Sequence, residues 1–333
     1  MTDILAANLL SPIPLAFALG IVARLMRSEF SLPKDIYSAL SIYLLFAIGL
    51  KGGVELSKAP MATMWAPIGV TLLLGVITPL SAYALVRYVG RFSTADAAGM
   101  AAHYGSVSAV TFIAAQQFVA RVGAPAEGFT PALLTMMESP GIHIALAIGA
   151  MQRRSPATSI SVTGSHAITA KPMRSVLHEV LTGRTMVLLV GGLVIGVAMG
   201  EHGWESVAPF FDGGFKGALT LFLLEMGIVA GDRLGDLKKT GPFLLAFGVI
   251  VPVLHGSLGA FLGRWAGMSA GGAAVLGAMA ASASYIAAPP AVRLTLPEAN
   301  PTYSLTAALA ITFPFNLLLG IPLYFHLSTI FAR

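Results

Sequence analysis

Two short stretches of the sequence place hydroxyl groups inside long apolar segments. The first carries Ser106, Ser108 and Thr111, and the second carries Ser282 and Ser284. Hydroxyl groups in hydrocarbon need a structural reason, and the small residues around these favour helices that are interrupted near their middle. An interruption frees backbone N–H groups, and the N-terminus of a half-helix attracts an anion. Together the stretches predict one small polar site; helix packing through small residues is the competing interpretation.

Larger polar side chains flank both stretches. His103 and Tyr104 precede the first stretch, and Tyr285 follows Ser284 in the second. Because imidazole titrates near neutral pH, His103 is a candidate for binding an anion or relaying a proton, and otherwise for a hydrogen bond to a neighbouring helix. Tyr285 either donates its hydroxyl to a carboxylate or fills space. We include these three side chains in the predicted substrate site.

The motifs of other chemistries are missing from the sequence. The absence of Cys excludes disulfides, thiolate metal sites and cysteine nucleophiles. His178-Glu179 has no second His at the spacing of the HExxH zinc motif. A hydrolase that used Ser106 or Ser108 with His103 would have neither a GxSxG motif nor an acid partner. We therefore predict that the protein is not an enzyme and needs no organic cofactor.

The elements that must position these side chains are predicted to be transmembrane helices. Only 11% of the 333 residues are charged, 56% are hydrophobic and the mean hydropathy is +0.80. This composition excludes a water-soluble globular enzyme and predicts an all-α polytopic membrane protein with about ten spans. The net charge of +5 is typical of basic cytoplasmic loops and does not require a nucleic-acid partner. The predicted spans are 9–26, 36–53, 62–88, 95–120, 130–151, 184–200, 214–231, 242–266, 270–292 and 302–327.

One long polar stretch divides the predicted spans into five and five. Residues 152–183 are rich in Ser, Thr and Pro and predict a mobile loop. The predicted organisation is therefore a first five-helix repeat at 1–151, this loop, and a second repeat at 184–333. No removable signal peptide is expected at the start of the sequence. Lys and Arg divide 14 to 6 between the two sides of the spans, which places the loop in the cytoplasm and both termini outside.

The two halves share three landmarks in the same order. The matching segments are 49–53 with 227–231, 78–79 with 251–252, and 105–108 with 281–284. Because each half has an odd number of spans, the second copy enters the membrane from the opposite side, as in the inverted repeats of secondary transporters. The fourth and ninth spans are then the interrupted ones. Chance similarity between apolar helices is the alternative.

Along nearly its whole length the sequence resembles the sodium-dependent bicarbonate transporter family. The segments that carry the resemblance are 32–33, 48–53, 96–97, 105–111, 137–140, 255–256, 280–290 and 297–301. The resemblance implies bicarbonate import driven by sodium, a core domain that moves against a gate domain, a homotrimer, and inhibition by a PII-like cytoplasmic protein. The expected location is a bacterial inner membrane, and the expected partners are a small anion and membrane lipids.

The resemblance also assigns individual residues. The family's hydroxyl-rich site corresponds to Ser108 and Thr111 in the fourth span and to Ser282 and Ser284 in the ninth. Glu138 stands before Ser139-Pro140-Gly141, a triplet that predicts a break in the helix of the fifth span. It aligns with an acidic family position, which implies coupling or gating; a salt-bridged structural acid is the alternative.

The sequence departs from the family at one residue with consequences for coupling. Tyr285 stands where the family has an acidic residue, and a phenol does not offset the charge of Na⁺. Two kinds of coupling stay open. One is a sodium site that includes Ser282 and Ser284, and the other is coupling to protons. The sequence thus predicts a secondary active transporter for bicarbonate or a small carboxylate, working by alternating access. An anion channel and a non-transporting membrane sensor of the same fold are the alternatives.

Overall fold

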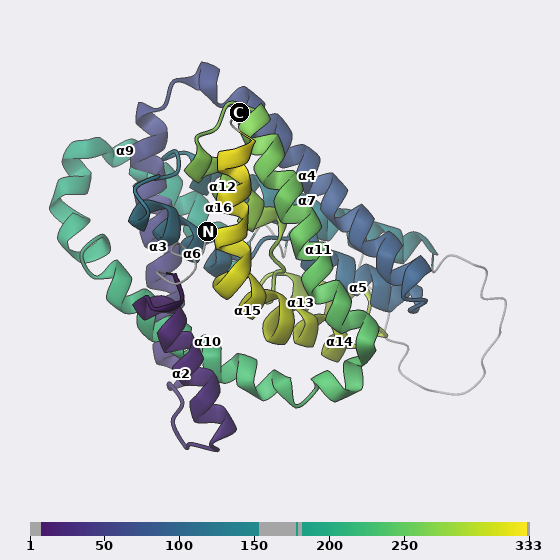
Figure 1. Cartoon of the computed structure of the whole chain (residues 1–333). Helices are drawn as coiled ribbons and strands as arrows, with labels where there is room; N and C mark the ends of the chain where they lie inside the picture. Colours follow the sequence, from purple (N-terminus) through teal and green to yellow (C-terminus); the bar gives the residue numbers. More distant parts are fainter. Residues whose placement is uncertain (1–7, 153–177, 179–181, 332–333) are drawn as a thin grey trace.

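The computed structural model describes residues 8–152, 178 and 182–331, and this part of the chain is helical, without strands (Figure 1). The predicted loop at 152–183 lies almost wholly outside the described residues. The helices of the first half are α2 (Pro12–Leu25), α3 (Lys34–Lys58), η1 (Met61–Thr63), α4 (Trp65–Ala84) with its extension η2 (Leu85–Val89), α5 (Thr94–Tyr104), α6 (Ala109–Arg121) and α7 (Thr130–Gln152).

The described part of the second half contains five helices and a final long, segmented one. They are α9 (Arg184–Phe211), α10 (Phe215–Leu234), α11 (Leu237–Trp265), α12 (Ala270–Ala280) and α13 (Ala288–Thr295). The last helix comprises α14 (Pro301–Thr306), η3 (Ala307–Thr312), α15 (Phe313–Phe315), η4 (Asn316–Gly320) and α16 (Ile321–Ile330). Its two η segments are π-helical, a local widening of the helix that is often found beside functional sites.

Six of the described helices are long and apolar enough to cross a membrane. They are Lys34–Lys58, Trp65–Val89, Thr130–Met151, Arg184–Phe211, Gly241–Trp265 and Pro301–Ile330. Of the other predicted spans, α2 has only 14 residues, the fourth and ninth each consist of two helices, and α10, with 20 residues, is long but not among the six. The prediction of an all-helical membrane protein is therefore confirmed, whereas the count of ten spans stays a prediction.

The helices form two groups. Figure 1 shows α2, α3, α9 and α10 on one side and most of the remaining helices on the other. Within the first group α3 packs along α9 and α2 along α10. Glycines allow these backbones to approach, since a Cβ added to Gly49 would lie 2.9 Å from the Cα of Gly192, and one added to Gly20 would lie 2.9 Å from the Cα of Gly227.

Glycines with positive φ bend two of the long helices. Gly200 in α9 has a φ of 60°, and Gly241 in α11 has a φ of 73°. A side chain is strained in this region of backbone space, so glycine is the suitable residue at both bends. The predicted span 184–200 ends at the first bend, and the predicted span 242–266 begins at the second. Beyond each bend the chain continues as helix instead of the expected loop.

The helix α7 corrects one sequence-based expectation. The triplet at 139–141, which contains Pro140, was expected to break the helix, but α7 is continuous from Thr130 to Gln152. The expectation was wrong because α7 packs along both α4 and α5, and such neighbours keep a proline-containing membrane helix in place.

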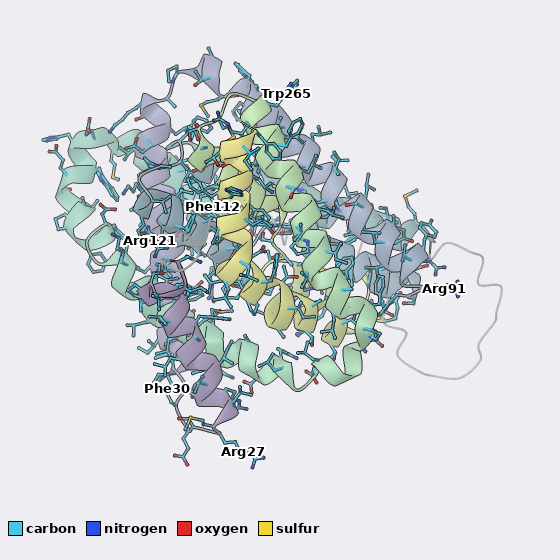
Figure 2. All side chains as sticks on the ribbon, in the orientation of Figure 1. Arg27, Phe30, Arg91, Phe112, Arg121 and Trp265 are labelled. Atoms are coloured by element: carbon cyan, nitrogen blue, oxygen red, sulfur yellow. The ribbon has the colours of Figure 1, made fainter. Side chains whose placement is uncertain are left out.

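Apolar side chains occupy the outside of the molecule as well as its interior. Phe112 lies within the helices and is fully buried, whereas Trp265 stands at the periphery with 75% of its surface exposed (Figure 2). Leu19 and Val194 are also exposed. Exposed apolar faces on long helices are typical of surfaces that contact lipid.

Candidate functional site

The first interruption separates α5 from α6 at residues 105–108. Gly105 ends α5, and Ser108 adopts an extended conformation with φ −89° and ψ 110°. The Ser108 hydroxyl accepts the backbone N–H of Thr111 at 3.2 Å and so caps α6. The hydroxyl group that caps α6 at this interruption therefore belongs to Ser108, one of the predicted site residues.

Tight packing explains why the chain leaves the helix here. A Cβ added to Gly105 would lie only 2.5 Å from the Cβ of Pro79 in α4. A Cβ on Gly141 of α7 would likewise overlap the carbonyl group of Gly105. The first interruption is thus held between two neighbouring helices that leave no room for a side chain.

The second interruption separates α12 from α13 at residues 281–287. The Ser284 hydroxyl accepts the backbone N–H groups of Ala287 at 3.2 Å and Ala288 at 3.4 Å, which caps α13. Pro289 and Pro290 occupy the first turn of α13, where a missing N–H costs no helical hydrogen bond.

The two interruptions cross each other, and we call residues 105–108 together with 281–287 the crossing. The backbone N–H of Ser108 donates to the Ser282 hydroxyl at 2.8 Å. In the other direction, the N–H of Ser284 donates to the carbonyl oxygen of His103 at 2.7 Å. Ser282 in turn donates its hydroxyl to the Met279 carbonyl at 2.8 Å. Each interruption therefore supplies hydrogen-bond partners to the other.

The crossing is buried and encloses a small cavity. Ser106, Ser108, Thr111, Ser282 and Ser284 are each at most 4% exposed. The cavity has a volume of about 10 Å³ and is lined by Val107, Ser108, Ala109, Glu138, Thr185, Ser284, Tyr285 and Ile286. Such a volume holds about one water molecule. The capped N-termini of α6 and α13 thus meet at one small cavity.

Glu138 of α7 is the acidic group of this cavity. Its side chain is 3% exposed, and its Oε2 has no hydrogen-bond partner among the described residues. It forms no ion pair with any residue that the structure describes, so the alternative of a salt-bridged structural acid finds no support there. A buried carboxylate without a partner is costly, and a proton or a bound cation would remove that cost.

Two hydroxyl groups near the crossing are also unpaired. The Ser106 oxygen is buried without a hydrogen-bond partner in the described part of the chain, and the buried Tyr285 hydroxyl has only the Ser108 hydroxyl near it, without the geometry of a regular hydrogen bond. The ring of Tyr285 is only partly buried and meets the ring of Phe313 edge-to-face at 5.9 Å between centroids. Both hydroxyls can therefore donate to a ligand without first losing another bond.

The structure places His103 and Tyr104 outside the small cavity. The Tyr104 hydroxyl is hydrogen-bonded to the Thr312 hydroxyl at 2.7 Å, and its ring packs on Phe247. His103 lines a different cavity of about 320 Å³, whose lining also includes Asp96 and Arg293. Its Nδ1 is buried without a partner among the described residues. Only the backbone of His103 takes part in the crossing.

The predicted sodium ligands differ in their availability. The Ser282 hydroxyl is engaged as acceptor and donor, whereas Ser284 lines the cavity next to Glu138. Within the described residues no group of three or more His, Cys, Asp and Glu side chains is arranged to hold a metal ion. A cation at this cavity would therefore depend on Glu138 and on hydroxyl and backbone oxygens.

Sequence reasoning missed the residue that holds the second interruption. Asn316, fully buried in the π-helical segment η4, donates its side-chain N–H to the Ala281 carbonyl at 2.9 Å. Its Oδ1 accepts the Tyr324 hydroxyl at 2.9 Å. Thr185 of α9, which lines the cavity, was missed as well. Asn316 could have been found as an amide side chain in an apolar predicted span, because polar groups there need a partner.

The sequence around both interruptions and Glu138 matches a known protein family. A family model described as the Na⁺-dependent bicarbonate transporter superfamily matches residues 12–329, which include both interruptions and Glu138. A search of curated proteins finds no match to the chain. The match covers nearly the whole sequence, so the family prediction made from sequence segments is confirmed. The chain belongs to the Na⁺-dependent bicarbonate transporter superfamily.

Proposed function

We propose that this protein is a secondary transporter that moves bicarbonate or a small carboxylate across a membrane by alternating access. The observation that carries the proposal is the crossing, where the N-termini of α6 and α13 meet at one buried cavity. Half-helix N-termini that converge in the middle of a bundle favour a small anion, because their N–H groups and dipoles are oriented toward it. Membership of a transporter superfamily supports the same conclusion.

The capping serines supply the means of recognition. Ser108 and Ser284 accept the N–H groups at the starts of α6 and α13. An anion that enters the cavity replaces the serine oxygens as acceptor, and the hydroxyls can then rotate and donate to it. The unpaired hydroxyls of Ser106 and Tyr285 add two further donors close by. In this structure the cavity is too small for bicarbonate, so binding requires the helices around it to separate.

The two groups of helices are the proposed moving parts. The group α2, α3, α9 and α10 is tied together by the close glycine contacts and suits a rigid gate domain. The helices that carry the crossing suit the core domain. The second helix of each half packs on the first helix of the other half, α3 on α9 and α10 on α2. This reciprocal packing supports the inverted repeat, in which all ten predicted spans cross the membrane.

Glu138 is the proposed coupling residue. A transported anion and the Glu138 carboxylate would repel each other in a cavity of this size, unless a cation or a proton accompanies the anion. We infer that sodium is the coupling ion, as the family name suggests, with Glu138 and Ser284 among its ligands. Glu138 then supplies the carboxylate that this site lacks at position 285, where Tyr285 stands in place of the family's acidic residue. Coupling to protons is the other outcome that the test must separate.

The test is uptake of labelled bicarbonate and acetate into proteoliposomes that hold the purified protein. Uptake should rise when an inward sodium gradient is imposed and should not respond to a pH gradient alone. The Glu138→Gln variant should bind the anion but lose the response to sodium, because its side chain is neutral without a cation. Uptake that follows only the pH gradient would assign the coupling to protons. No gradient-dependent uptake of either anion would contradict the transporter.

The remaining family expectations become part of the proposal. We propose a homotrimer in a bacterial inner membrane, with both termini outside and a PII-like regulator on the cytoplasmic side. Subunit counting after cross-linking in membranes and protease protection of tagged termini test the first two expectations. Conductance in planar bilayers would support the channel alternative, and anion binding without flux would support the sensor.

A further inference from the structure

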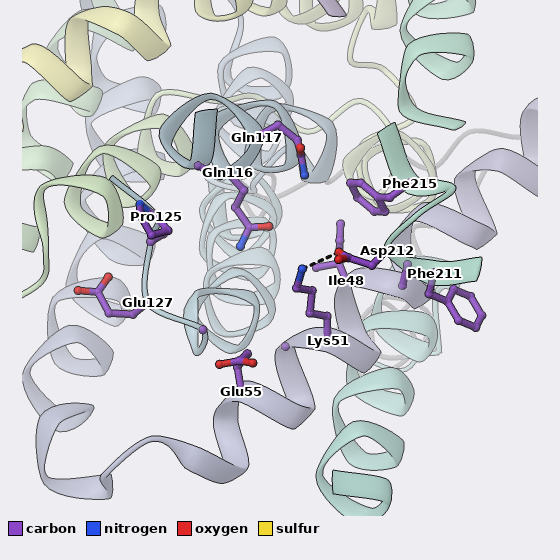
Figure 3. Close-up of a pocket in the computed structure, with 15 residues that line it drawn as sticks. Ile48, Lys51, Glu55, Gln116, Gln117, Pro125, Glu127, Phe211, Asp212 and Phe215 are labelled. Atoms are coloured by element: carbon purple, nitrogen blue, oxygen red, sulfur yellow. Dashed lines mark hydrogen bonds and ion pairs between the residues drawn. The ribbon is translucent and has the colours of Figure 1, made fainter. Parts of the chain in front are cut away.

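Two adjoining hollows lie at the end of α6 that is remote from the crossing. The acidic hollow, shown in Figure 3, has a volume of about 260 Å³, and its charged lining residues are Lys51, Glu55, Glu127 and Asp212. The basic hollow has a volume of about 790 Å³, and its charged lining residues are Lys51, Arg121, Asp212 and Lys216. Both hollows bring the C-terminal half of α6 together with α3 and the junction between α9 and α10.

An ion pair is shared by the two hollows. The Lys51 ammonium group lies 2.6 Å from a carboxylate oxygen of Asp212 (Figure 3), and both residues line the acidic and the basic hollow. Since these two charges cancel, the remaining charges decide the sign of each hollow. Glu55 is paired with Lys58 at 3.4 Å, so Glu127 leaves the acidic hollow negative, whereas Arg121 and Lys216 leave the basic hollow positive.

The two cations of the basic hollow are not neutralised nearby. Neither Arg121 nor Lys216 has a carboxylate partner in the part of the chain that the structure describes. Arg121 donates one N–H to the amide oxygen of Asn8 at 3.0 Å and lies over the ring of Phe118. A guanidinium group has five N–H donors, so most of them stay free for another acceptor. The backbone of α6 connects this group to the crossing over about 18 Å.

We propose that the basic hollow is a capture site for small anions, in which Arg121 and Lys216 raise the local concentration of the anion before it reaches the crossing. The inference rests on the proposed function and adds an entry site to it. A concave surface with one sign of charge concentrates ions of opposite sign and speeds their association. The hollow ends on Phe215, which belongs to the same apolar core as Phe112 and Ile113 of α6. The apolar core thus separates the captured anion from the crossing in this structure.

The absence of cysteine permits a direct measurement of the sign of each hollow. Gly217 lines the basic hollow, and a side chain added there meets no atom within 4 Å, so Gly217→Cys introduces a thiol without a clash. Ala126→Cys places the matched thiol in the acidic hollow beside Glu127. Each variant is labelled with a negatively and a positively charged methanethiosulfonate reagent of similar size. The ratio of the two rates reports the local potential, because thiol reactivity affects both reagents equally.

At low ionic strength the ratio of the negative to the positive reagent's labelling rate should be about three-fold higher at Gly217→Cys than for a free thiol. At Ala126→Cys the same ratio should be lower than for a free thiol. Arg121→Gln or Lys216→Gln, added to Gly217→Cys, should each lower its ratio about two-fold, and 1 M salt should abolish the preference. If neither Arg121→Gln nor Lys216→Gln changes the ratio of labelling rates at Gly217→Cys, the proposal is overturned. Since labelling needs no transport, this result is separate from a failure of the proposed function.

Transport provides the second measurement. In proteoliposomes at low ionic strength, the Arg121→Gln/Lys216→Gln double variant should raise the KM for bicarbonate about four-fold and leave the maximal rate unchanged. The matched control is Lys58→Gln, which removes a cation that is paired with Glu201 at 2.9 Å and with Glu55 at 3.4 Å and that lines neither hollow. An unchanged KM in the double variant, in protein that transports, would also overturn the proposal.

Discussion

The two interruptions are held in different ways. At 105–108 the chain is clamped between α4 and α7, where Pro79 leaves no room for a side chain on Gly105 and the Gly105 backbone leaves none for a side chain on Gly141. At 281–287 the chain is held by side-chain hydrogen bonds, above all the bond from Asn316 to the Ala281 carbonyl. Both interruptions are unwound segments with a capping serine. The first is therefore stabilised by close packing and the second by hydrogen bonds.

Because of this difference, one part of the site can be rigid while another part adjusts. A close-packed segment moves only with its neighbours, because any displacement creates a clash or a void. A hydrogen-bonded segment can exchange its partners at low cost when a ligand offers equivalent ones. We expect the second interruption to adapt to the anion while the first keeps its geometry.

Gly141→Ala should have the largest effect. Its Cβ would overlap the Gly105 carbonyl, so α7 and the first interruption must move apart, at a cost of about 3 kcal/mol or more. The control is Gly191→Ala in α9, whose added Cβ meets nothing within 4 Å and which should stabilise the helix by up to about 1 kcal/mol. Thermal unfolding of both variants in detergent provides the comparison. A stable Gly141→Ala variant would show that the clamp is not rigid.

Asn316→Leu should disturb the second interruption. The Ala281 carbonyl would be buried without its donor, which costs about 1–3 kcal/mol. Tyr324→Phe is the matched control, because it keeps the Asn316–Ala281 bond and removes only the Tyr324 hydroxyl. We expect Asn316→Leu to raise the KM for the anion and Tyr324→Phe to change stability alone. Equal effects of the two variants on KM would contradict a special role of Asn316.

Removal of the capping hydroxyls should weaken both interruptions moderately. Ser108→Ala and Ser284→Ala should each cost about 1 kcal/mol of stability through the lost cap, and both should raise the KM for the transported anion. Ser269→Ala removes a cap of the same kind from the other end of α12, far from the crossing. It should cost similar stability without any change in KM. A KM effect of Ser269→Ala as large as that of Ser108→Ala would mean that the caps act only through stability.

Tyr104→Phe should have the smallest effect. The substitution removes one buried hydrogen bond, to Thr312, and should cost about 1 kcal/mol. Since Thr312 also donates to the Gly248 carbonyl at 2.8 Å, it keeps a partner. Transport at saturating anion should be unchanged, which would separate Tyr104 from the serines with which the sequence grouped it. A raised KM would return Tyr104 to the substrate site.

Much of the fold could be predicted from the sequence because the relevant signals are local. Composition and hydropathy predict a helical membrane protein, and runs of Gly, Ser and Pro predict where helices are interrupted. The segments 105–108 and 281–284 were identified in this way, and the structure shows unwound backbone at both. The prediction failed at 139–141, where the same kind of local signal is overruled by packing against α4 and α5.

By itself the sequence determined the class of protein, its family and the places where two helices unwind, because these depend on the residue types within a few turns. Only the tertiary structure decided which polar groups meet. Ser108 and Ser282 are 174 residues apart, and their contact depends on how α6 and α12 rotate and cross. The same packing turned Tyr104 toward Thr312 and brought Glu138 to the cavity. A helix's rotation about its axis is decided by distant packing partners, which no local pattern encodes.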